Sequence, residues 1–74
     1  MNRNIDGWRV MGHITQGEGA RRLFIRVSHP ERDITRDHEL TGFNHRSDVE
    51  ASRFVEQQVD GITGVSSDGS LKFR

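Results

Sequence analysis

The sequence predicts an α+β fold, in which one helix packs on one face of a small antiparallel sheet. Residues 8–15 and 21–28 each alternate apolar and polar side chains, as half-buried strands do. Residues 48–60 repeat apolar side chains at intervals of three and four, as an amphipathic helix does. The expected order is strand, strand, an optional third strand, helix and strand. One helix across one sheet face is the simplest way to bury both apolar surfaces.

Length and composition set the scale of this fold. With 74 residues, the chain forms one domain that spans residues 1–74. Apolar residues make up 31% of the chain and charged residues 30%, so the core is lean. Domains of this size have a thin stability margin. We therefore expect the fold to gain stability from a partner or from dimerisation.

The first two strands are expected to form an antiparallel hairpin. In the first, Trp8, Val10 and Ile14 fall on one side. In the second, Leu23, Ile25 and Val27 do the same. The glycine-rich connector at residues 16–20 has the length of a hairpin loop.

The next segment is ambiguous. Residues 29–33 contain Pro30 and a polar cluster, which end the second strand. Beyond them, Leu40 and Phe43 could anchor a short edge strand at about residues 38–43, or they could tether a long loop. We expect the edge strand.

The helix has clear signals at both ends. Ser47 and Glu50 have the spacing of a capping box, so the helix should begin at Asp48. Gly61 stands where a left-handed cap residue is expected, which ends the helix at Asp60. The apolar stripe consists of Ala51, Phe54, Val55, Val59 and Ile62.

The C-terminal residues show one more hairpin pattern. Residues 62–65 and 70–73 flank the turn-forming sequence Ser66-Ser67-Asp68-Gly69. Leu71 and Phe73 alternate with basic side chains, which favours a final strand.

The side of the hairpin away from the core is the main candidate surface. Arginines around an aromatic ring suit phosphates and stacked bases. Arginine, methionine and aromatic residues are also enriched in protein interfaces. A merely solvated sheet face is the third interpretation. The candidate partner-binding residues are Arg9, Met11, His13, Arg22, Phe24 and Arg26.

Charge suggests an alternative surface. The formal net charge is zero, but residues 1–27 carry five arginines against two carboxylates, and residues 28–74 carry six basic against nine acidic residues. Acidic side chains on the outer helix face could therefore meet a basic partner. The residues of this alternative site are Glu50, Glu56 and Asp60.

The sequence predicts no catalytic, metal or cofactor site. The four histidines match no common zinc spacing, and there is no cysteine. Asp37-His38-Glu39 has no nucleophile placed beside it by a recognisable motif. Because the N-terminus lacks a signal-peptide pattern and no apolar run approaches the ~20 residues of a membrane span, we expect a soluble intracellular protein.

Two resemblances bear on function. The hairpin, the pattern Phe43-x-x-x-Ser47-x-x-Glu50-Ala51 and the following helix resemble the sheet-plus-helix module of phage integrase arm-binding and plant AP2-type domains. In those families the sheet face away from the helix docks into DNA. This resemblance implies DNA contacts by Arg9, Arg22 and Arg26.

In size and element order, the chain also resembles small phage-encoded inhibitors, in particular type I anti-CRISPR proteins. These proteins act by occupying a partner's surface. The resemblance implies a non-enzymatic inhibitor from a phage or mobile element, which acts in the bacterial cytoplasm on a host protein or ribonucleoprotein complex. A nucleic-acid-binding module that uses the arginine-rich sheet face is the alternative.

Overall fold

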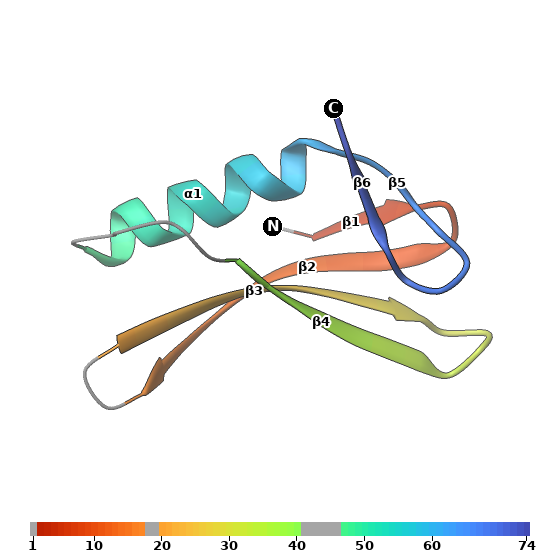
Figure 1. Cartoon of the computed structure of the whole chain (residues 1–74), viewed down its shortest axis with the longest axis horizontal. Coiled ribbons are helices and arrows are strands. Elements are labelled where there is room, and N and C mark those ends of the chain that lie inside the picture. Colours follow the sequence, from red (N-terminus) through yellow and green to blue (C-terminus); the bar gives the residue numbers. More distant parts are fainter. Residues whose placement is uncertain (1, 18–19, 41–46) are drawn as a thin grey trace.

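The computed structural model describes residues 2–17, 20–40 and 47–74 (Figure 1). Six strands and one helix lie in these residues, and the fold is α+β as predicted. In chain order they are β1 (Asn2–Ile5), β2 (Trp8–Gly17), β3 (Ala20–His29), β4 (Ile34–Leu40), α1 (Asp48–Asp60), β5 (Ile62–Val65) and β6 (Leu71–Phe73).

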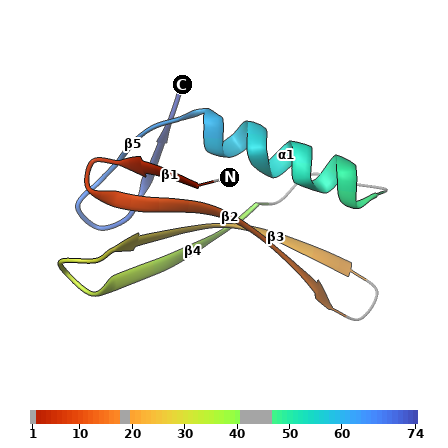
Figure 2. The same cartoon turned by 180° about the vertical axis from the view of Figure 1, so that it is seen from behind.

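The first four strands form one antiparallel sheet in the order β1-β2-β3-β4. Helix α1 lies across one face of this sheet, and no described element covers the other face (Figures 1 and 2). Strands β5 and β6 form a separate two-stranded antiparallel sheet beyond the C-terminal end of the helix. The predicted final strand is therefore half of this second sheet.

The core lies between the sheet, the helix and β5. As predicted, the apolar positions of β2 and β3 point inward, and the helix adds Ala51, Val55 and Val59. Phe54 is half-buried at the margin of this core rather than at its centre. The buried core residues, each at most 6% exposed, are Trp8, Val10, Leu23, Ile25, Val27, Ala51, Val55, Val59, Ile62 and Val65.

Strand β1 was not predicted, because Asn2–Ile5 contains a single apolar residue. The turn that follows it explains why it forms. Asp6 and Gly7 both have positive φ, 53° and 84°, and this is the conformation of the tight turn that joins antiparallel strands with the usual twist. The dipeptide Asp-Gly is a strong hairpin signal, and it stands at this position in the sequence.

The predicted third strand exists but has different bounds. It spans Ile34–Leu40 instead of residues 38–43, and Phe43 lies outside the described residues. It pairs with β3 so that Leu40 stands opposite Leu23 and His38 opposite Ile25. Because Arg36 and His38 occupy the core-facing positions, the apolar alternation that marks β2 and β3 is missing here.

The N-terminal end of the helix is capped as predicted. The Glu50 amide donates a hydrogen bond to Ser47 Oγ at 3.2 Å. The predicted left-handed cap at Gly61 is wrong, since this residue has right-handed φ and ψ of −80° and −9°. Instead, Arg3 Nη1 of β1 donates to the carbonyl oxygens of Val59 at 2.7 Å and Ile62 at 3.1 Å. A cation from the opposite end of the chain thus compensates the negative end of the helix dipole.

The β5–β6 turn packs against the sheet. Gly69 is buried with φ of 90°, and a Cβ there would lie 2.9 Å from Arg36 Cδ. Its carbonyl oxygen lies 2.7 Å from His38 Nε2. A glycine is therefore required at this turn for both its backbone conformation and its close approach to β4.

Candidate binding surface

We call the sheet face opposite helix α1 the open face. Because alternate residues of a strand point to opposite sides, the register of the four strands determines which residues lie on this face. All six residues predicted for the main candidate surface lie on it. The open face consists of Asn2, Asn4, Arg9, Met11, His13, Thr15, Arg22, Phe24, Arg26, Ser28, Thr35, Asp37 and Glu39.

Two of the predicted arginines are engaged with carboxylates of β4. Arg26 Nε and Nη2 donate to the two carboxylate oxygens of Asp37 at 2.7 and 3.1 Å. Arg22 makes the same two-point contact with Glu39, with both distances at 3.0 Å. These hydrogen bonds lower the pKa of Asp37 and of Glu39 and raise the pKa of both arginines. Two of the three arginines on the described open face are therefore neutralised within the protein.

Asp37 and Glu39 were absent from the predicted site. Their pairing with Arg26 and Arg22 depends on the register of β3 and β4, which places Asp37 directly opposite Arg26. The available signal was their spacing of two residues, which puts both carboxylates on one face of any strand that includes them. An edge strand at residues 38–43 does not include Asp37, which lies in β4.

Phe24 and Met11 give the centre of the open face an apolar character. Both side chains are half-buried. The Arg22 guanidinium carbon lies 5.6 Å from the centroid of the Phe24 ring, which is within cation–π range. His13 stands directly opposite Phe24 in the register of β2 and β3, and the two ring centroids lie 6.3 Å apart. This part of the surface combines an aromatic centre with a rim of paired charges.

The β1 end of the open face has a different character. Arg9 makes no ion pair or hydrogen bond with any other described residue. Its direct cross-strand neighbours are Asn4 on β1 and Ser28 on β3, and Asn2 stands opposite Met11. A shallow pocket of about 300 Å³ opens here, lined by Asn2, Arg3, Asn4, Arg9 and Met11.

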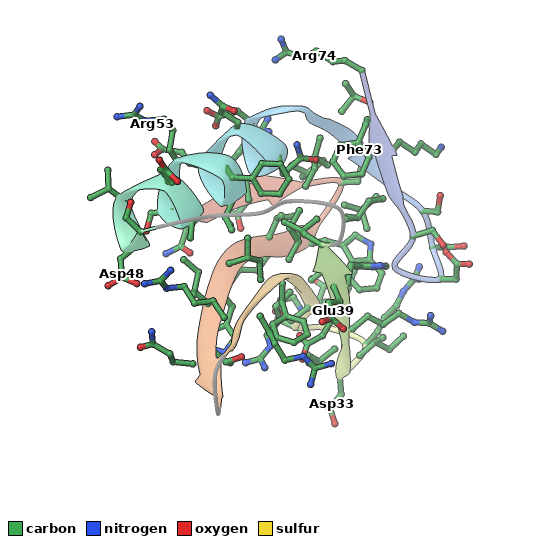
Figure 3. The ribbon with its side chains drawn as sticks, turned by 60° about the vertical axis from the view of Figure 1, so that its left-hand side comes forward. Asp33, Glu39, Asp48, Arg53, Phe73 and Arg74 are labelled. Atoms are coloured by element: carbon green, nitrogen blue, oxygen red, sulfur yellow. The ribbon has the colours of Figure 1, made fainter. Side chains whose placement is uncertain are left out.

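The alternative acidic surface does not form a continuous patch. Glu50, Glu56 and Asp60 are exposed on α1, as predicted. Arg53 lies three residues from both glutamates, so it interrupts them on the helix surface. Figure 3 shows Arg53 projecting away from the sheet, with Asp48 at the beginning of the helix. This side of the molecule presents mixed charge around Val49, which is 66% exposed.

The histidines have structural contacts. His29 packs edge-on against Trp8, with ring centroids 5.1 Å apart, and His38 contacts Gly69. His45 lies outside the described residues. Among residues 2–17, 20–40 and 47–74, no three His, Asp or Glu side chains are grouped so that they could share a metal ion.

Helix α1 falls short of the length and apolarity that a membrane-spanning helix needs, and the described residues contain no other helix. No protein-family model matches the sequence, and comparisons with curated proteins and with solved structures found no match either. The resemblances to anti-CRISPR and AP2-type proteins thus stay predictions.

Proposed function

We propose that this protein is a non-enzymatic binding protein that docks a partner protein on the open face of its sheet. It would act by occupying a surface of a host protein or ribonucleoprotein complex. The observation that carries the proposal is the pairing of Arg22 and Arg26 with Glu39 and Asp37 around Phe24.

Charge balance favours protein over nucleic acid as the partner. Nucleic-acid affinity comes largely from cations that replace the counterions of phosphates. Three arginines lie on the described open face, but two of them already hold carboxylates. A phosphate chain would have to displace these carboxylates or approach them. Protein interfaces, in contrast, combine arginines and aromatic anchors with paired charges at their rim.

Burial gives a second argument for the open face. Phe24 and Met11 are large apolar side chains on a sheet surface that no described element covers. An aromatic anchor surrounded by polar groups is the usual composition of an interface hot spot. The outer face of α1 offers Val49 as its exposed apolar side chain, with charges of both signs around it.

The test compares single substitutions on these two surfaces. The tagged protein, Phe24→Ser and Val49→Ser would each be used to capture partners from a bacterial lysate treated with nuclease. We expect a stoichiometric protein partner that survives nuclease, is lost with Phe24→Ser and is retained with Val49→Ser. Circular dichroism of both variants checks that the fold is kept.

Other outcomes would overturn the proposal in identifiable ways. Loss of the partner with Val49→Ser alone would move the interface to the outer face of α1. Recovery of nucleic acid alone would support the DNA- or RNA-binding alternative. In that case Arg22→Ala and Arg26→Ala should each weaken binding and reduce its salt dependence.

A further inference from the structure

We infer that the pocket at the β1 end of the open face receives a carboxylate side chain of the partner protein, with Arg9 as its cation. This inference rests on the proposed function, which it extends to a specific contact. The pocket is lined by Asn2, Arg3, Asn4, Arg9 and Met11.

The open face already shows what its arginines bind. Arg22 and Arg26 each hold a carboxylate through two parallel hydrogen bonds, because the neighbouring strand β4 supplies Glu39 and Asp37. Arg9 lies on the same face, on strand β2, where its cross-strand neighbours carry no charge. Strand β1 places the neutral amide of Asn4 opposite it. Arg9 is therefore the arginine of this face whose carboxylate is not supplied by the described residues.

The other lining groups suit an anion. The amides of Asn2 and Asn4 lie on the same face as Arg9, and each can donate hydrogen bonds. Met11 contributes an apolar wall, and none of the described residues that line the pocket carries a carboxylate. The volume of about 300 Å³ is at the small end of the range for ligand sites, so the pocket suits one side chain.

The number of available charges favours a carboxylate over a phosphate. The guanidinium of Arg3 is held at the C-terminal end of α1 by the carbonyl oxygens of Val59 and Ile62. Arg26, which stands opposite Met11, is paired with Asp37. Among the described residues that line the pocket, Arg9 thus remains as the free cation, and it neutralises one monovalent carboxylate. A phosphate dianion would keep an uncompensated charge.

The experiment measures binding of small probes to the whole protein at low ionic strength. Amide chemical shifts would be followed by NMR during titration with the peptide Ac-Gly-Glu-Gly-NH2. The neutral peptide Ac-Gly-Gln-Gly-NH2 and inorganic phosphate serve as comparisons. We expect saturable shifts at residues 2–4 and 9–11 with the glutamate peptide. Because an exposed ion pair contributes little binding energy, the glutamine peptide should bind about two- to fivefold more weakly.

Two variants assign the site. Arg9→Gln should abolish the shifts, and Arg53→Gln, which removes an exposed arginine from the outer face of α1, should leave them unchanged. Equal shifts from both peptides, shifts that survive Arg9→Gln or an absence of shifts would each overturn the inference. Tighter binding of phosphate than of the glutamate peptide would also overturn it.

The partner-capture assay separates this inference from the proposed function. If Phe24→Ser abolishes capture and Arg9→Gln does not, the open face is the interface, and the pocket is not occupied by a partner carboxylate. If both variants capture the partner normally, the proposed function itself is wrong.

Discussion

On strand β3, Ile25 is fully buried beneath helix α1, whereas its neighbours Phe24 and Arg26 point the other way, onto the open face. The core-facing side of the sheet consists mostly of close-packed aliphatic residues. The open side combines a half-buried ring with ion pairs that span β3 and β4. This contrast separates what holds the fold together from what is available to a partner.

The largest expected effect comes from adjacent residues on these two faces. Ile25→Ala should cost ~2–5 kcal/mol of unfolding free energy, because it removes a fully buried aliphatic side chain. Phe24→Ala removes a half-buried ring from the open face and should cost about 1 kcal/mol. Urea unfolding followed by circular dichroism measures both. Ile25→Val, with an expected cost of ~0.5–1.5 kcal/mol, keeps the comparison measurable if Ile25→Ala does not fold. Equal costs for Ile25→Ala and Phe24→Ala would break the distinction between the two faces.

A smaller effect is expected where the β5–β6 turn closes the core-facing side. Gly69→Ala would force a side chain into a positive-φ position and against Arg36, so we expect a loss of about 1–3 kcal/mol. Thermal unfolding measures this change. Ser67→Ala, at an exposed position of the same turn, is the matched control and should be close to neutral. A neutral Gly69→Ala would mean that the turn does not pack on β4.

The smallest effect belongs to the ion pairs of the open face. The Arg26 hydrogen bonds lower the pKa of Asp37 in the folded state, so the pair stabilises the fold above the ordinary pKa of about 4. This stabilisation is lost as the pH falls through the lowered pKa. Asp37→Asn should therefore be slightly less stable than the unsubstituted protein at pH 7, and the two should converge at acidic pH. Denaturant unfolding at several pH values checks this.

The same substitution in an Arg26→Met background tests the physical cause. Without the guanidinium, which is the largest cause of the lowered pKa of Asp37, Asp37→Asn should change the pH dependence of stability much less. Persistence of the difference in that background would show that another group sets the pKa of Asp37. High salt should reduce the effect of Asp37→Asn, because exposed pairs are screened.

The elements with strong periodicity were predictable from the sequence. Strands β2 and β3 alternate cleanly, and the helix has a Ser47 cap and a regular apolar stripe. The bounds of strand β4 were not predictable, because Arg36 and His38 face inward and contact the β5–β6 turn. Polar residues on both sides of a strand hide its period. Polar side chains that point inward also suit an edge strand, since they discourage pairing with another chain.

The residues that form the candidate surface could be predicted from the sequence, but the pairing of their charges could not. Alternation alone placed Arg22, Phe24 and Arg26 on one face. Whether these arginines are free depends on the neighbouring strand and its register, which no local pattern encodes. The β1 end of this face depended likewise on the Asp6-Gly7 turn, which brings Asn4 beside Arg9.

The contacts of strand β1 constrain the order in which the protein can assemble. Arg3 binds the carbonyl oxygens of Val59 and Ile62, and Asp6 Oδ2 accepts a hydrogen bond from the Val65 amide at 3.1 Å, so β1 and its turn lie beside the C-terminal end of α1 and β5 (Figures 1 and 2). These contacts span 56–59 residues of a 74-residue chain. Contacts between such distant residues form slowly, because a long loop must close first. A ribosome makes β1 long before the end of α1 and β5, so these contacts can form only after residue 65 has been synthesised.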